Sequence, residues 1–182
     1  MKRDRRPSVP YATHIIPAVS WSDLTAADTT LHSLRELADR ATHDPAGVAA
    51  LFSGGSRRSR VLAAEVVAGS LGTDLLTVDI SAVVSKWLGE TEKNLSRVFA
   101  VAERTQAVLL LDEADALFGA RTETTDAHDR YSHQAVNFLI REIPRFPGVV
   151  ILSTKAANDP GLAAIRRIAI DVRFHRRPIS SA

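Results

Sequence analysis

The stretch Val108-Leu-Leu-Leu-Asp112-Glu113-Ala-Asp115 decides the fold class, because it places four apolar residues directly before two adjacent carboxylates. An apolar run without alternation predicts a strand that is buried on both faces. Two interpretations of Asp112 and Glu113 stay open from this stretch alone. They are carboxylates placed for chemistry at the end of a strand, or an acidic turn that follows a buried strand.

Strands and helices alternate on both sides of this stretch. Strands are predicted at 48–52, 75–78, 107–111, 149–153 and 168–174, and helices at 31–41, 61–71, 91–106, 134–143 and 162–166. Asp28, Thr29 and Thr30 are placed to supply an N-cap for the first helix. The alternation predicts a parallel sheet covered on both faces, with ligands beyond the carboxyl ends of its strands. The loops after Phe52, Val78, Leu111 and Ser153 are therefore the places to seek chemistry.

Further stretches, in the same order along the chain, carry a resemblance to a known family. They are SKWLGETEKN at 85–94, DEADALFGAR at 112–121, DAHDRY at 126–131 and VVILST at 149–154. From about Trp21 to Phe174 the chain resembles the AAA+ ATPases, particularly the bacterial and phage-related members found near contractile injection systems. The resemblance implies an α/β fold of three layers, the P-loop NTPase fold of the AAA+ large subdomain, with a five-stranded parallel sheet between helices.

The resemblance also implies a pore loop. Lys86, Trp87, Leu88 and Gly89 match the segment whose aromatic residue projects into the central pore of a ring and grips a threaded polypeptide. A core aromatic is the alternative for Trp87. The neighbouring Lys86 and Gly89 favour an exposed loop.

The same resemblance assigns catalytic roles. It makes Asp112 the Mg²⁺ ligand and Glu113 the carboxylate that polarises the attacking water. Lys155 stands where the family usually places an asparagine that positions this water, and a lysine ammonium cannot accept a hydrogen bond. Arg166 and Arg167 match the arginine finger pair that reaches the nucleotide of a neighbouring subunit, with a basic helix end as the alternative.

The phosphate-binding loop departs from the family pattern G-x-x-x-x-G-K-[ST]. The corresponding segment is Gly54-Gly55-Ser56-Arg57-Arg58-Ser59-Arg60-Val61. Ser59 replaces the second glycine, Arg60 replaces the lysine, and Val61 replaces the hydroxyl that would bind Mg²⁺. This predicts a degraded Walker A site, although a basic helix N-terminus still favours anions. A solvated basic loop is the alternative.

Composition narrows the class of protein. The 182 residues carry a net charge of +2 and include no cysteine, which excludes disulfides and thiolate chemistry and fits a cytoplasmic setting. The sequence shows neither a membrane span nor a signal peptide. The expected organisation is a basic tail at 1–20, the AAA+ large subdomain at 21–176 and a C-terminal tail at 177–182, without the helical lid domain.

Three functional hypotheses follow. The first is a degenerate AAA+ module for protein remodelling or complex assembly that binds ATP and Mg²⁺ poorly and associates with a protein substrate, with intact AAA+ subunits or in an oligomer. The second is an active ATP-hydrolysing remodeller with an atypical P-loop. The third is a nucleic-acid binder that uses the clustered arginines. It is the weakest of the three, because the sequence shows no basic surface interleaved with aromatic residues.

Overall fold

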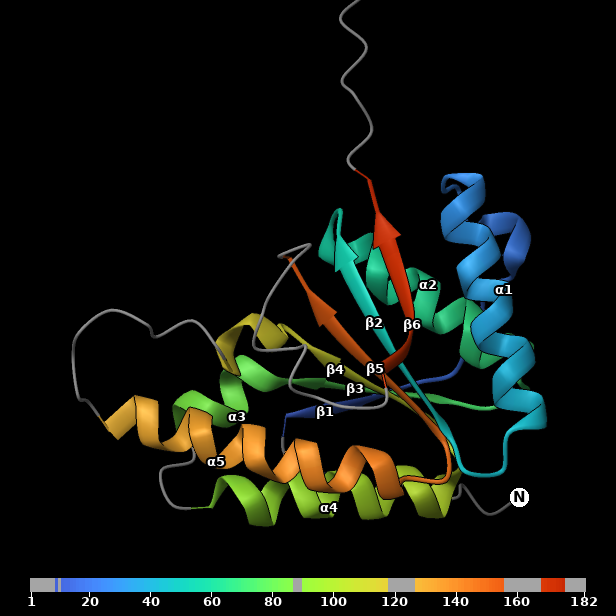
Figure 1. Cartoon of the computed structure of the whole chain (residues 1–182). Helices are drawn as coiled ribbons and strands as arrows, with labels where there is room; N and C mark the ends of the chain where they lie inside the picture. Colours follow the sequence, from blue (N-terminus) through green and yellow to red (C-terminus); the bar gives the residue numbers. More distant parts are fainter. Residues whose placement is uncertain (1–8, 10, 87–89, 118–126, 156–167, 176–182) are drawn as a thin grey trace, which may run out of the picture.

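A single mixed sheet with helices on both faces makes up the fold in the computed structural model, which describes residues 9, 11–86, 90–117, 127–155 and 168–175 (Figure 1). The strands are β1 (Ala12–Ile15), β2 (Val48–Gly54), β3 (Leu75–Asp79), β4 (Val108–Asp112), β5 (Val149–Thr154) and β6 (Ile168–Phe174). The helices are α1 (Asp28–His43), α2 (Arg57–Ser70), α3 (Ile80–Lys86), α4 (Thr91–Thr105) and α5 (Ala127–Glu142). Short 3₁₀ turns cover Trp21–Asp23, Ala114–Leu117 and Ile143–Arg145.

Within the part of the chain that the structure describes, the sheet has six strands in the order β1-β3-β4-β5-β2-β6. The five predicted strands are present and parallel to one another, which confirms the predicted fold class. The sixth strand, β1, pairs antiparallel with β3 from Ala12 to Ile15 and was missed. It lies within the segment predicted as a basic tail. The strand is only four residues long and incompletely buried, so it carries little of the apolar pattern that marked the others.

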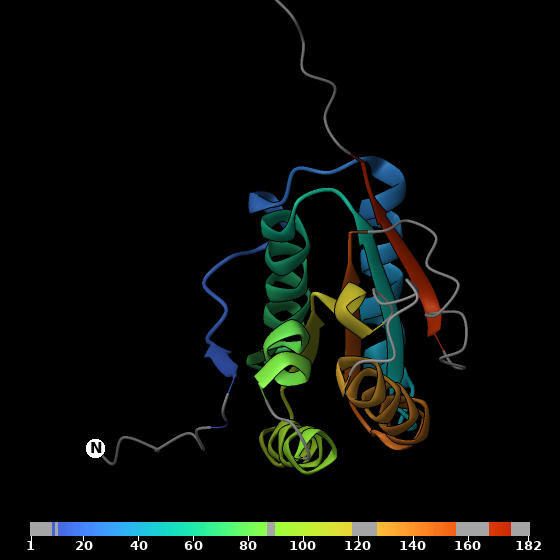
Figure 2. The same cartoon turned by 90° about the vertical axis from the view of Figure 1, so that its left-hand side faces the viewer.

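Two hydrophobic clusters show why the parallel strands are apolar without alternation. Leu109 and Leu111 pack in one cluster with α4 and α5, while Val108 and Leu110 pack in the other with α1 and α2. Successive side chains of a strand point to opposite faces, so every residue of β4 is buried. In Figures 1 and 2, α4 and α5 lie together, apart from α1 and α2.

Helix starts differ from the sequence expectation in several places; α5, for example, begins at Ala127 and not at 134. The N-cap of α1 is Ala27, with no side-chain cap, because Asp28 is already helical. Thr30 instead donates its hydroxyl to the carbonyl of Arg173 at 2.6 Å, which ties α1 to β6. The helix α3 was not predicted, although Asp79 begins it by accepting from Ala82 N at 3.2 Å and from the Ser81 hydroxyl at 2.6 Å.

The loop after β2 requires glycine for two separate reasons. Gly54 has a φ of +74°, in the left-handed region, and a Cβ there would lie 2.6 Å from the carbonyl oxygen of Phe174 at the end of β6. Gly72 has a similar φ of +70° but nothing within 4 Å of its added Cβ. An alanine at Gly72 would therefore meet backbone strain alone, whereas an alanine at Gly54 would meet both backbone strain and steric overlap.

We therefore expect Gly54→Ala to destabilise the protein clearly more than Gly72→Ala. The Gly72 variant pays only the left-handed backbone cost of about 1 kcal/mol, whereas the Gly54 variant must also displace β6. Urea unfolding followed by circular dichroism gives both free energies of unfolding. Equal losses in the two variants would show that β6 does not confine this loop.

Candidate functional site

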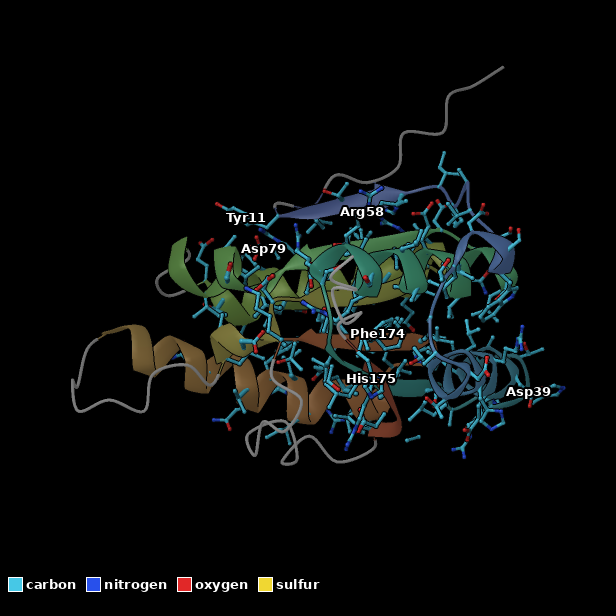
Figure 3. All side chains as sticks on the ribbon, turned by 90° about the horizontal axis from the view of Figure 1, so that it is seen from above. Tyr11, Asp39, Arg58, Asp79, Phe174 and His175 are labelled. Carbon is cyan, nitrogen blue, oxygen red and sulfur yellow. The ribbon has the colours of Figure 1, made fainter. Side chains whose placement is uncertain are left out.

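A cluster of interacting polar side chains lies where β2, β5 and β4 end. Because β5 lies between β2 and β4, the strand order brings Asp112 at the end of β4 close to Ser153 on β5 and to the loop that follows β2. This is the edge of the sheet where the sequence predicted the site. In Figure 3, Asp79 at the end of β3 lies beside Tyr11, and Phe174 marks the end of β6.

The loop after β2 leads straight into α2, which begins at Arg57, four residues before the predicted start. Ser56 is the N-cap and accepts a hydrogen bond from the backbone N–H of Ser59 at 3.0 Å. The two serine hydroxyls lie 2.7 Å apart, so both are engaged in the cap. Ser59, in the position of the second P-loop glycine, therefore stabilises the helix start.

Arg60 is fully buried, at 0% exposure, on the first turn of α2. Its Nε donates to the Ser153 hydroxyl at 2.7 Å, and its Nη1 donates to the carbonyl of Gly54 at 2.7 Å and lies 3.5 Å from that of Gly55. Its Nη2 is buried and has no hydrogen-bond partner among the described residues. The guanidinium is thus held by the carbonyl side of the loop, whereas a P-loop cradles phosphates with backbone N–H groups.

Asp112 is the buried centre of the cluster, with 0% of its side chain exposed. Its Oδ1 accepts from the Ser153 hydroxyl at 2.8 Å, and its Oδ2 accepts from Nε of Arg57 in a short contact. The hydrogen bond to Asp112, followed by the charge of this carboxylate, raises the pKa of Arg57 above its ordinary value. Both carboxylate oxygens are therefore bound by groups of the chain itself.

Glu113 is neutralised in a similar way. Its Oε2 lies 2.8 Å from Nζ of Lys155, and its Oε1 lies 3.9 Å from Nε of Arg57. The hydrogen bond from Lys155 to Glu113, followed by the charge of Glu113, raises the pKa of Lys155. Asp115 holds the end of β5 by accepting from the backbone N–H of Lys155 at 3.0 Å and from the hydroxyl of Thr154. Lys155 therefore lies at the site, as predicted from its position.

The predicted site residues fall into three groups. The first comes together here and consists of Gly54, Gly55, Ser56, Arg57, Ser59, Arg60, Asp112, Glu113 and Lys155. The second does not join it: Arg58 is exposed on α2, and Val61 packs against the hydrophobic cluster of α1 and α2. The third cannot be placed: Trp87, Leu88, Gly89, Arg166 and Arg167 lie outside the described residues, and Lys86 ends α3.

Sequence reasoning did not name Ser153, Thr154 and Asp115 as site residues. Ser153 links the Arg60 guanidinium to the Asp112 carboxylate, and Asp115 ties β4 to the end of β5. The available signal was Ser153 and Thr154, the two polar residues at the end of the otherwise apolar strand Val149–Thr154. They lie directly before the loop where the sequence predicted chemistry.

Comparison with known proteins identifies the family. Residues 50–176, more than half of the chain, match the family model described as "ATPase family associated with various cellular activities (AAA)". The chain belongs to the AAA ATPase family. The match extends from within β2 past the end of β6, and so includes every element of the site described above.

Individual relatives agree with this membership. An uncharacterized AAA family ATPase of Sinorhizobium fredii, y4kL, is 33% identical over 129 residues, which cover 70% of this chain and 38% of the relative. Spastin of Drosophila virilis is 27% identical over 165 residues, which cover 82% of this chain and 21% of spastin. The chain thus spans well under half of the length of these relatives.

A solved structure shows the same fold. The crystal structure of the FIGL-1 AAA domain matches with a TM-score of 0.68 and 19% sequence identity, covering 93% of this chain and 58% of that domain. At this identity the likeness speaks for the fold alone. In the present chain, none of the described helices is long and apolar enough to cross a membrane.

Family membership implies ATP and Mg²⁺, and the arrangement of this site does not fit the metal. The two oxygens of Asp112 are bound by Arg57 and Ser153. The motif position that supplies a hydroxyl ligand in the family is Val61, whose hydrocarbon side chain packs against the hydrophobic cluster of α1 and α2. Among the described residues, no group of three or more histidine, aspartate or glutamate side chains is placed to hold a metal ion.

We expect Arg60→Ala to destabilise the domain by about 3 kcal/mol or more, because it removes charge-assisted hydrogen bonds and leaves a buried void. Arg40→Ala is a matched control, since Arg40 pairs with Glu36 at 2.9 Å on the exposed surface of α1. Its loss should stay within about 0.5 kcal/mol. Denaturant unfolding measures both, and comparable losses would argue against a structural role for the buried guanidinium.

Proposed function

We propose that this AAA domain is a degenerate ATPase module, which contributes to protein remodelling or complex assembly while its own nucleotide binding and hydrolysis are impaired. The observation that carries the proposal is the contact of Arg57 with the buried Asp112 carboxylate. In the family this carboxylate holds the Mg²⁺ that accompanies ATP. A carboxylate already bound by an arginine and a serine is not available for that task.

The surrounding contacts support impairment of the chemical step. Phosphoryl transfer depends almost entirely on positioning and charge stabilisation, so the catalytic glutamate must be free to orient a water. Here the Glu113 carboxylate is in contact with the Lys155 ammonium at 2.8 Å. Arg60, in the position of the phosphate-binding lysine, donates to carbonyls of the loop itself. Glu113 and Arg60, two elements of the expected electrostatic clamp, are thus each engaged by other groups of the chain.

The resemblance supports a role with other proteins. Lys86, Trp87, Leu88 and Gly89 match a pore loop, and Arg166 and Arg167 match arginine fingers that act on a neighbouring subunit. A domain that keeps these segments could associate with intact AAA+ subunits and complete their sites, or bind a protein substrate in a homo- or hetero-oligomer. The likeness to members found near contractile injection systems suggests assembly of a large complex, in the cytoplasm, as the setting.

The decisive experiment is ATP hydrolysis by the purified protein. We expect Mg²⁺-dependent phosphate release no faster than that of a Glu113→Gln variant, because the clamp for the γ-phosphate is not formed. Isothermal titration calorimetry with ATP, with and without Mg²⁺, should show no metal-dependent binding. Robust turnover that the Glu113→Gln substitution abolishes would instead establish an active ATPase with an atypical P-loop.

A further inference from the structure

We propose that Arg57 is a built-in replacement for the divalent cation, so that this domain neither binds Mg²⁺ at Asp112 nor requires it for stability. The inference deepens the proposed function and rests on the same site. It goes further by naming the group that takes the place of the metal and by predicting which substitution would open the site to a metal.

The starting point is the environment of Asp112. The residue ends a strand in which every residue is buried, and its own side chain is 0% exposed. A buried carboxylate is costly unless a counter-charge and hydrogen bonds compensate it. Arg57 supplies the charge at Oδ2, and Ser153 supplies a hydrogen bond at Oδ1. The chain itself thus supplies both a counter-charge and a hydrogen bond to this carboxylate.

The first turn of α2 explains why Arg57 can do this. Ser56 caps the helix so that Arg57 is its first residue, next to the loop and beside the end of β4. Arg57 and Arg60 are three residues apart and therefore lie on the same face of α2. Arg57 binds Asp112 directly, and Arg60 binds Ser153, which in turn binds Asp112. This chain of hydrogen bonds therefore runs from Arg57 through Asp112 and Ser153 to Arg60, so both of its ends lie on α2.

A divalent cation would have to compete with these positive charges. Mg²⁺ needs oxygen ligands at about 2.1 Å in a nearly octahedral arrangement. At Asp112 it would meet the Arg57 guanidinium, and at Glu113 it would meet the Lys155 ammonium, 2.8 Å from Oε2. The position of the remaining protein ligand holds Val61, which packs into the hydrophobic cluster of α1 and α2. Each candidate ligand is thus either paired with a cation or absent.

The test is to remove the arginine and look for a gain of metal binding. Wild-type protein should bind Mn²⁺, a paramagnetic probe for the magnesium site, no better than an Arg40→Ala control in an electron paramagnetic resonance titration. Its melting temperature should not change with Mg²⁺ at constant ionic strength. Arg57→Ala should melt at a lower temperature, bind Mn²⁺ at least about tenfold more tightly, and be stabilised by Mg²⁺.

Two further variants assign the gained site and guard against misfolding. Arg57→Gln removes the charge but keeps a side-chain amide that can donate to Asp112, so it should fold and still gain Mn²⁺ binding. The double variant Arg57→Ala, Asp112→Asn removes both charges of the pair. It should recover stability relative to Arg57→Ala without metal and should bind Mn²⁺ no better than wild type, which would locate the gained ion at Asp112.

The outcomes separate this inference from the proposed function. Mn²⁺ binding by the wild-type protein that Asp112→Asn abolishes, or absence of any gain in both Arg57→Ala and Arg57→Gln, would overturn the inference even if the protein hydrolyses no ATP. ATP turnover by a wild-type protein that binds no Mn²⁺ would contradict the proposed function and leave the inference intact.

Discussion

A buried carboxylate that needs a positive partner organises the functional end of this domain. Asp112 reaches its position because β4 is a central strand, covered by α4 and α5 on one face and by α1 and α2 on the other. Its charge cannot be solvated there, so the surrounding chain must compensate it. The compensation by Arg57 and Ser153 ties together the start of α2, the end of β4 and the end of β5.

The same requirement explains why the loop after β2 has its shape. Arg60 is buried beneath the loop and draws the carbonyls of Gly54 and Gly55 toward its guanidinium. A backbone that presents carbonyls to a buried cation shows the opposite polarity from one that presents N–H groups to an anion. Left-handed conformations at Gly54 and Gly55, close against Phe174, allow the chain to take this course. Loop geometry and local charge therefore agree with each other.

The sequence was sufficient for the parallel core because burial leaves a strong pattern. An apolar run such as Val108 to Leu111 removes all of its side chains from water only in a central strand that is covered on both faces. The sequence was insufficient for β1, whose four residues, one of them exposed, are stabilised by pairing with Leu75–Val78, a contact distant in sequence. It also missed α3, where Asp79 serves both as the end of a strand and as the cap of the next helix.

Motif register predicted that Asp112, Glu113, Lys155 and the loop residues share one edge of the sheet, and the structure brings them together there. Their catalytic roles stay predictions, and the contacts among them were not predicted. Motif register placed both Arg57 and Arg60 in the phosphate-binding segment, with a solvated basic loop as the alternative. The structure shows that Arg60 binds the loop and that Arg57 binds Asp112. Which cation finds which carboxylate depends on where α2 begins, and the Ser56 cap places that start four residues earlier than hydrophobic periodicity indicated.

The origin of the counter-charge has consequences for how an AAA site behaves. An ion or ligand from solution stabilises the folded state only in proportion to its concentration and affinity, so folding and occupancy are coupled. A side chain on α2 is held beside Asp112 by the covalent chain and is present at a high effective concentration at all times. On the proposal that Arg57 replaces the cation, its pairing with Asp112 stabilises the fold by itself, and a metal would have to displace this contact in order to bind. The contacts that hold α2, β4 and β5 together at this edge of the sheet are thus the same contacts that engage Asp112.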